Sequence, residues 1–229
     1  MDIIKKIFPS KNLPKVKKDI ILFIGLIFLI VILFLTDLLT KYFMFQHYFY
    51  SPYMVKPTNS IPYCTRSDVA IPGLFDMTLV FNNGAAWNML SNHKWLLSML
   101  SLIGSLAFIY VFIFYFNKLN LGLKISICLM FSGCFGNMID RFGYWVNKPG
   151  IYQYGVIDFI QFHFWKDFPV FNFADAFLII GIVVAVISYI VMLISQSKTE
   201  KEIETTSSSI SNSDLEEKLK QNKENNKDE

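Results

Sequence analysis

IILFIGLIFLIVILFL, at residues 20–35, is an unbroken apolar run without a charged side chain. Three later segments have a similar character, and we expect four membrane-spanning helices at about residues 20–42, 95–116, 123–141 and 173–195. A helix needs about 20 apolar residues to cross a hydrocarbon core of about 30 Å. The sequence therefore predicts an all-α membrane protein and excludes a soluble enzyme.

The composition agrees with a membrane protein. Of 229 residues, 53% are hydrophobic and 17% are charged, whereas soluble domains have about 25% charged residues. Residues 1–19 contain six Lys and two Asp, a basic arm that precedes an apolar segment and gives no support for a nucleic-acid partner. The three cysteines lack C-x-x-C spacing, so neither a disulfide framework nor a zinc site is expected.

Charge also predicts how the chain crosses the membrane. Short segments rich in Lys and Arg stay on the cytoplasmic side. The basic arm and the connection at 117–122, flanked by Lys118 and Lys124, are therefore expected in the cytoplasm, together with both termini. The long connections at about 43–94 and 142–172 then face outward. An Asn-Gly turn at Asn83 and Gly84, between β-prone residues, predicts a small β-rich cradle there.

The C-terminal segment differs from the rest of the chain. From Lys198 onward the sequence is rich in Ser, Lys, Glu and Asn, with six Lys against nine acids at 198–229. Because it has few apolar residues to bury, we predict a disordered cytoplasmic tail at 196–229. The chain is thus expected to consist of an arm (1–19), a membrane domain (20–195) and this tail.

Polar residues at the ends of the spans are informative, because each costs free energy in a membrane unless it is paired or functional. In the expected topology they form one layer near the outer leaflet. Asp37 and Lys41 share a helix face at spacing i,i+4, and we interpret them as a structural ion pair. Asn137, Asp140 and Arg141 share a face of the third span and are interpreted as scaffold for a site.

Asp158 and Asp175 are the candidate reactive groups. Asp158 lies among large apolar residues with no adjacent base, and Asp175 directly precedes the fourth apolar run. Singly, Asp158 could be an ordinary interfacial acid, and Asp175 could form a capping box with Asn172. Together they begin and end one short outer loop, so they can meet.

Two adjacent carboxyl groups in a poorly solvated site share a proton. The ionised member can deprotonate a water that attacks a peptide carbonyl, and the protonated member can donate to the oxyanion and the leaving nitrogen. A helix N-terminus favours negative charge, so Asp175 is assigned as the base and Asp158 as the acid. This is the chemistry of an aspartic protease. The three histidines lack metal-ligand spacing, so no metal is expected.

The motifs together resemble one family, the bacterial lipoprotein signal peptidases (prolipoprotein signal peptidase, signal peptidase II). The resemblance covers about residues 20–195. The matching segments, in the order of the family, are Asp37-Leu-Leu-Thr-Lys41, Asn82-Asn-Gly-Ala-Ala-Trp87, Gly133-Cys-Phe-Gly-Asn-Met-Ile-Asp-Arg141, Val156-Ile-Asp-Phe159 and Phe171-Asn-Phe-Ala-Asp175.

The resemblance implies a membrane aspartyl endopeptidase of the bacterial cytoplasmic membrane, without a metal or organic cofactor. Its substrates would be diacylglyceryl-modified prolipoproteins, cut just before the lipid-bearing cysteine, with Asp158 and Asp175 as the catalytic pair. Membrane lipids and globomycin-type cyclic peptide inhibitors are implied as further partners. The residues implied to orient the pair and hold the substrate backbone are Asn82, Gly84, Gly133, Asn137, Arg141 and Asn172.

Two other functions stay open on the residues alone. A small proton-coupled transporter could use Asp37, Asp140 and Asp175 as a relay, but it would favour acids at mid-membrane depth and repeated spans. A non-catalytic membrane scaffold would tolerate the loss of either the Asp158 or the Asp175 carboxylate. Single Asp-to-Asn substitutions discriminate between these functions and a peptidase.

Overall fold

The computed structural model describes residues 13–55, 63–84, 89–90, 93–143 and 155–225. Among these residues, four helices are long and apolar enough to cross a membrane, with spanning parts at Pro14–Phe49, Trp95–Lys118, Leu121–Arg141 and Phe173–Lys201. The helices are α2 (Leu13–Phe49), α3 (Lys94–Tyr115), which the 3-10 turn η2 (Phe116–Lys118) follows, α4 (Leu121–Arg141) and α5 (Phe173–Asn225). With the small sheets described below, they confirm the predicted fold class.

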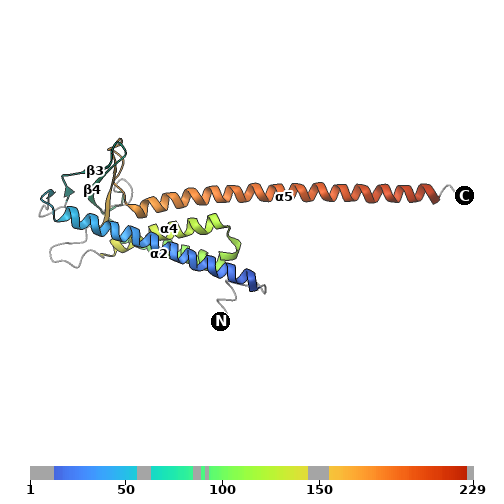
Figure 1. Cartoon of the computed structure of the whole chain (residues 1–229), viewed down its shortest axis with the longest axis horizontal. Coiled ribbons are helices and arrows are strands. Elements are labelled where there is room, and N and C mark those ends of the chain that lie inside the picture. The colour runs from blue at the N-terminus through green and yellow to red at the C-terminus, as the bar shows by residue number, and fades with distance from the viewer. Residues whose placement is uncertain (1–12, 56–62, 85–88, 91–92, 144–154, 226–229) are drawn as a thin grey trace. The chain divides into compact units, whose positions relative to one another are not determined.

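Helix α2 is longer at both ends than the span predicted at 20–42. At its C-terminal end Phe45, Tyr48 and Phe49 are buried in a core cluster with residues of the strands. These aromatic residues have helical spacing, so one helix face continues to be buried after the membrane run has ended. The strands lie beside this end of α2 (Figure 1).

The β-rich cradle contains two antiparallel sheets. One is formed by β1 (Met54–Val55) and β2 (Tyr63–Cys64), and the other by β3 (Asp68–Ile71), β4 (Phe75–Asn82) and β5 (Val156–Phe162) in the order β3-β4-β5. In the β4–β5 register, Val80 lies opposite Asp158. Asn83 and Gly84 follow the end of β4, and residues 85–88 lie outside the described part of the chain, so the Asn-Gly turn stays a prediction. Strand β4 thus carries Asn82 to the side of β5 that holds Asp158.

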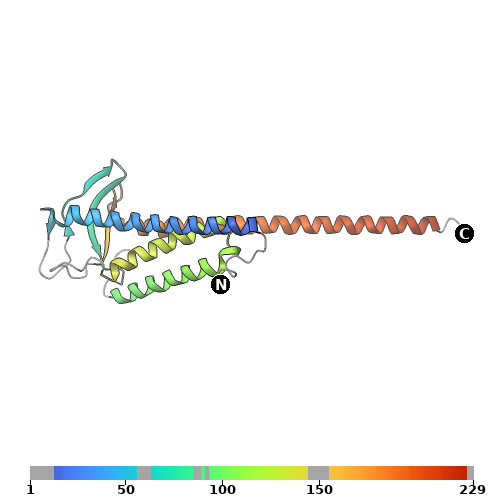
Figure 2. The ribbon, with the colours of Figure 1, turned by 60° about the horizontal axis from the view of Figure 1, so that its bottom comes forward.

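Helix α4 packs against the three other helices. It lies alongside α3 (Figure 2), and a second core cluster forms where α2, α3 and α4 meet. It approaches α5 through Gly133, because a Cβ there would lie 2.4 Å from the carbonyl oxygen of Ala174. Close approach through small residues is typical of helix pairs in membranes.

The chain divides into two compact units, Met1–Ala185 and Val186–Glu229. In the second unit α5 continues as far as Asn225, through most of the segment at 196–229 for which the composition predicts disorder. Glu, Lys and Gln are good helix formers, and extending an existing helix requires no new nucleation. In the predicted basic arm, residues 13–19 belong to α2, whereas 1–12 lie outside the described residues.

Candidate active site

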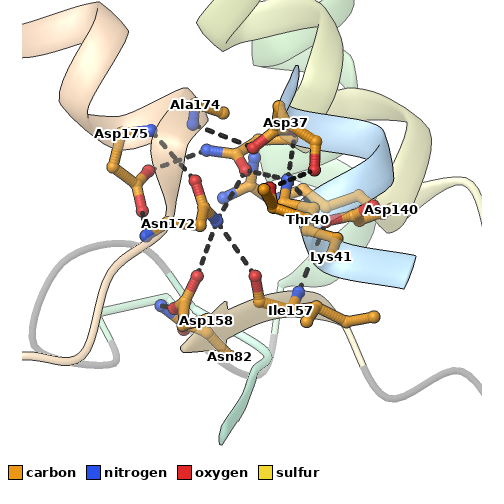
Figure 3. Close-up of polar contacts among 12 residues, drawn as sticks. Asp37, Thr40, Lys41, Asn82, Asp140, Ile157, Asp158, Asn172, Ala174 and Asp175 are labelled. Carbon is orange, nitrogen blue, oxygen red and sulfur yellow. Dashed lines mark hydrogen bonds and ion pairs between the residues drawn. The ribbon is translucent and has the colours of Figure 1, made fainter. Parts of the chain in front are cut away.

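The two candidate acids come from different elements that meet at one end of the helices. Asp158 lies in the middle of β5, and Asp175 lies in the first turn of α5 (Figure 3). Residues 156–160 are all buried, which leaves Asp158 only 1% exposed. Asp175 is partly exposed. The site therefore pairs a buried carboxyl group with one that solvent can contact.

Three asparagine side chains donate hydrogen bonds to these acids. Asn82 Nδ2 lies 2.9 Å from Asp158 Oδ2, and Asn172 Nδ2 lies 2.7 Å from Asp158 Oδ1. Asn137 Nδ2 lies 2.7 Å from Asp175 Oδ1. The three donors come from β4, from the residue before α5 and from α4, so the acids are held by three separate parts of the fold.

A hydrogen-bond donor on the opposite side sets the orientation of each asparagine amide. Backbone N–H groups and a lysine ammonium can only donate, so they require the amide oxygen and turn the NH₂ group toward the carboxyl group. The three contacts are Gly84 N with Asn82 Oδ1 (2.9 Å), Asp175 N with Asn172 Oδ1 (3.0 Å) and Lys41 Nζ with Asn137 Oδ1 (3.0 Å). The direction of each NH₂ group is therefore fixed by the hydrogen bond that the oxygen of the same amide accepts.

Asn172 and Asp175 also cap helix α5. The backbone N–H of Asp175 donates to Asn172 Oδ1 at 3.0 Å, and the backbone N–H of Asn172 donates to Asp175 Oδ2 at 3.2 Å. This reciprocal pattern is the capping box that the sequence allows at these positions. Because the same side chains bond Asp158 and Asn137, capping of the helix and alignment of the two acids depend on the same atoms.

Lys41 lies between two carboxylates inside the helix bundle. Its Nζ is 2.7 Å from Asp37 Oδ2 and 2.9 Å from Asp140 Oδ2, and its side chain is 0% exposed. The ion pair predicted at i,i+4 is present, and Asp140 joins it from α4. Each carboxylate also accepts a backbone N–H next to a candidate acid: Ala174 N lies 2.9 Å from Asp37 Oδ1, and Ile157 N lies 3.3 Å from Asp140 Oδ2 (Figure 3).

The remaining predicted site residues lie around this network. Arg141 donates to Ser101 Oγ at 3.1 Å and makes a long contact of 3.5 Å with the carbonyl oxygen of Gly84. It thereby links α4 to α3 and to the segment after β4. Gly133 is at the contact of α4 with α5, so its effect on the acids is through the placement of α5.

The two acids have different electrostatic environments. Burial, followed by the negative charge of Asp175, raises the pKa of Asp158 well above its ordinary value, and these effects outweigh the hydrogen bond from Asn82. Asp175 accepts two N–H groups, from the Asn137 side chain and from the backbone of Asn172. The arrangement therefore places a buried acid that favours its protonated form beside an acid that is held by N–H donors.

Comparison with known proteins assigns the family. The family model described as Signal peptidase (SPase) II matches residues 18–191. The chain belongs to the signal peptidase II family. The resemblance that the five motifs carry is thus confirmed, and the protein is a peptidase. This assignment does not favour a transporter or a scaffold.

Individual relatives agree with the signal peptidase II assignment. The chain is 36% identical over 134 residues to the lipoprotein signal peptidases of Staphylococcus aureus strains JH9 and Newman, which covers 58% of this chain and 75% of each relative. A solved chain described as a bacterial membrane enzyme structure by the in meso method at 2.3 Å resolution aligns with a TM-score of 0.54 and 30% identity. That alignment covers 72% of this chain and 87% of the solved chain. A second such structure, at 1.9 Å, has a TM-score of 0.52 and 30% identity, and covers 72% and 92% of the two chains.

Some contacts of this signal peptidase II site are not evident from the sequence. Asp140, which the sequence predicts as scaffold for a site, also completes the charge pairing of Lys41 and accepts the backbone N–H of Ile157. Ser101, which accepts from Arg141, was not singled out. A single serine in an apolar span does not indicate which residue will form a hydrogen bond with it. The spacing of Asp140 from Asn137 places both residues on one face of α4, and this spacing is the feature of the sequence that indicates a shared site.

Proposed function

We propose that this protein is an aspartic endopeptidase that removes signal peptides from diacylglyceryl-modified prolipoproteins by cutting just before the lipid-bearing cysteine. Membership of the signal peptidase II family and the named lipoprotein signal peptidases among its relatives support the substrate class. The geometry around Asp158 and Asp175 supports the aspartic type of mechanism.

The observation that carries the mechanism is the asymmetry of the two acids. Asp158 is buried and has a raised pKa, which favours its protonated form, while Asp175 is partly exposed and accepts N–H donors. A general base and a general acid of this kind are what hydrolysis of an amide by an activated water requires.

In the proposed reaction, Asp175 removes a proton from a water molecule as its oxygen bonds to the scissile carbonyl carbon. Asp158 donates its proton to the carbonyl oxygen, which gives a neutral gem-diol. Asp158 then takes a proton back from one hydroxyl, the C–N bond breaks, and the proton on Asp175 passes to the leaving nitrogen. The products are a carboxylic acid on the signal peptide and a free amine on the cysteine, and both acids return to their initial state.

The asparagines and their neighbours are proposed to orient this reaction. Asn82 and Asn172 hold the two oxygens of Asp158, and Asn137 holds Asp175. Arg141 at the end of α4 contacts the carbonyl oxygen of Gly84, which follows β4, and polar groups here can hold an extended substrate backbone. Gly133 contributes by letting α5 approach α4.

The lipid on the substrate is consistent with a site at the end of membrane helices. Apolar side chains such as Phe28 on α2 and Ile179 on α5 are exposed along the spanning parts, and we propose that they face membrane lipids. Because the basic arm and Lys118 favour the cytoplasm, we place both termini there and the acids near the outer leaflet of the bacterial cytoplasmic membrane. Globomycin-type peptides are proposed to occupy the same site as the substrate.

A processing assay with defined substrates tests this function. The full chain in nanodiscs is incubated with a prolipoprotein that carries diacylglycerol on its cysteine, and with the same prolipoprotein without lipid. We expect the lipidated form alone to be cut, with mass spectrometry showing cysteine as the new N-terminus. Cleavage at another bond, equal cleavage of the unlipidated form, or no cleavage of either would contradict the proposal.

A further inference from the structure

Lys41 makes more hydrogen bonds than an ion pair with a single neighbour on its own helix would require. An ammonium group has three N–H donors. Nζ has three acceptors, Asp37 Oδ2 at 2.7 Å, Asp140 Oδ2 at 2.9 Å and Asn137 Oδ1 at 3.0 Å. Every donor therefore has a partner in the protein, and the ammonium cannot rotate freely without breaking one of these contacts.

Two donors hold the oxygen of Asn137. Lys41 Nζ lies 3.0 Å from Asn137 Oδ1, and Asn172 Nδ2 lies 3.1 Å from the same oxygen. If the amide turned over, its NH₂ group would face both donors and two buried hydrogen bonds would be lost. The amide therefore keeps its NH₂ group on the other side, 2.7 Å from Asp175 Oδ1.

The orientation of this amide matters for the chemistry of Asp175. An N–H group that points at a carboxylate favours the ionised form, whereas a carbonyl oxygen in the same place would favour the protonated form. Asn172 Nδ2 has only two hydrogens for three acceptors, Asp158 Oδ1 at 2.7 Å, Asn137 Oδ1 at 3.1 Å and the carbonyl oxygen of Ile157 at 3.2 Å, so it holds the Asn137 oxygen weakly. The Lys41 ammonium, which can only donate, is the second donor that holds this oxygen.

From this geometry we propose that Lys41 is a positioning residue that fixes the Asn137 amide and thereby keeps its NH₂ group directed at Asp175, the proposed base. The inference rests on the proposed peptidase function, since it assigns Lys41 a role in that reaction. This positioning role goes beyond the structural ion pair with Asp37, because a purely structural ion pair would not affect Asp175. Asp37 accepts the N–H of Ala174 and Asp140 accepts the N–H of Ile157, so the two carboxylates that pair with Lys41 also hold the backbone beside both acids.

A double-mutant cycle on catalysis tests this role. The variants are Lys41→Met, Asn137→Ala, the double variant and Lys41→Arg, each assayed for kcat, KM and pH dependence with a diacylglyceryl prolipoprotein. Lys124→Met is the matched control, because Lys124 is a buried lysine of α4 whose ammonium lies 4.2 Å from the centre of the Phe116 ring, away from the acids. Thermal unfolding of each purified variant in one detergent measures its stability separately from its activity.

We expect Lys41→Met to lower kcat about 100-fold, in the range of lost acid–base assistance, with KM changed less than about two-fold. The acid limb of its pH profile should move to higher pH. The double variant should be no slower than Asn137→Ala to within about three-fold, because Lys41 acts through Asn137. Lys41→Arg should recover at least part of kcat, and Lys124→Met should retain it.

Other results would overturn the inference. If the two kcat losses multiply in the double variant, or if Lys41→Met leaves the acid limb unchanged, Lys41 does not act through Asn137. If the wild type cleaves no prolipoprotein, the proposed function fails instead. Should Lys41→Met not fold because two buried carboxylates lose their cation, the variant Lys41→Met/Asp140→Asn is compared with Asp140→Asn alone, and the same shift of the acid limb is required.

Discussion

Asn172 Nδ2 lies 2.7 Å from Asp158 Oδ1, although Asn172 is also the residue that caps the helix of Asp175. One side chain therefore joins the strand that carries the buried acid to the helix that carries the partly exposed one. The separation of the acids is set by a helix start and a strand in register, both rigid elements. Sites built on such elements keep their geometry better than sites on loops.

Removing a donor from Asp158 should reduce catalysis. Asn82→Ala removes the hydrogen bond to Asp158 Oδ2, so the carboxyl group is no longer held on that side. We expect kcat to fall about 10- to 100-fold, with a smaller change in KM. Asn120→Ala is the matched control, because Asn120 caps α4 through Leu123 N. That variant should lose about 1 kcal/mol of stability but keep kcat. Equal kcat losses in both variants would show that the Asn82 effect is merely structural.

Activity should depend on pH in a bell-shaped manner. Asp158 must hold its proton, and this proton is lost as pH rises through its raised pKa, so the alkaline limb should lie well above the range of an ordinary aspartic acid. Asp175 must be ionised, which sets the acid limb. Initial rates between about pH 4 and pH 9 measure both limbs. A profile that is flat across this range would contradict proton sharing between the acids.

The same raised pKa predicts how stability depends on pH. Because folding raises the pKa of Asp158, the folded chain binds this proton more tightly than the unfolded chain. Its contribution to stability is full below the unfolded pKa of about 3.9 and is lost as pH rises through the folded pKa. Relative to Asp158→Asn, the wild type should therefore lose thermal stability as pH rises from about 4 through the raised pKa of Asp158. A difference in melting temperature that stays constant with pH would refute this linkage.

Glycine at position 133 should be required for helix packing. In Gly133→Ala the new Cβ would lie 2.4 Å from the carbonyl oxygen of Ala174, a backbone atom that cannot move without shifting the start of α5. We expect a loss of about 1–3 kcal/mol, as for other overpacked sites, together with lower activity. Gly25→Ala in α2 is the control, since no atom lies within 4 Å of its Cβ. Unfolding in detergent compares the two, and a Gly133→Ala protein as stable as Gly25→Ala would show that this contact is loose.

The sequence predicts the helices of this fold better than the contacts of its site. Long apolar runs locate the spans because a membrane imposes their length. The extension of α2 to Phe49 was not predicted, because it depends on burial of Phe45 against strands that are distant in the chain. The meeting of Asp158 and Asp175 could be predicted, since a short loop restricts their separation.

Contacts between helices were harder to predict. The spacing of Asp37 and Lys41 predicts their pair on one helix, but a sequence does not show that Asp140 completes it from α4. Helix α5 also continues to Asn225 where low hydrophobicity predicts disorder, because good helix formers can extend an existing helix. Such features depend on tertiary contacts or on an adjoining element rather than on local composition.

The most direct test of the account compares dyad variants in one processing assay. Purified wild type, Asp158→Asn and Asp175→Asn are incubated with diacylglyceryl-modified prolipoprotein, and the shift of the product on a gel is measured. Asp76→Asn is the matched control, because Asp76 is also a buried acid of the three-stranded sheet, but it is paired with His163 and Lys166. We predict cleavage by the wild type and Asp76→Asn and none by either dyad variant. Cleavage by a folded Asp158→Asn or Asp175→Asn protein would contradict the assignment of these two residues as the catalytic pair.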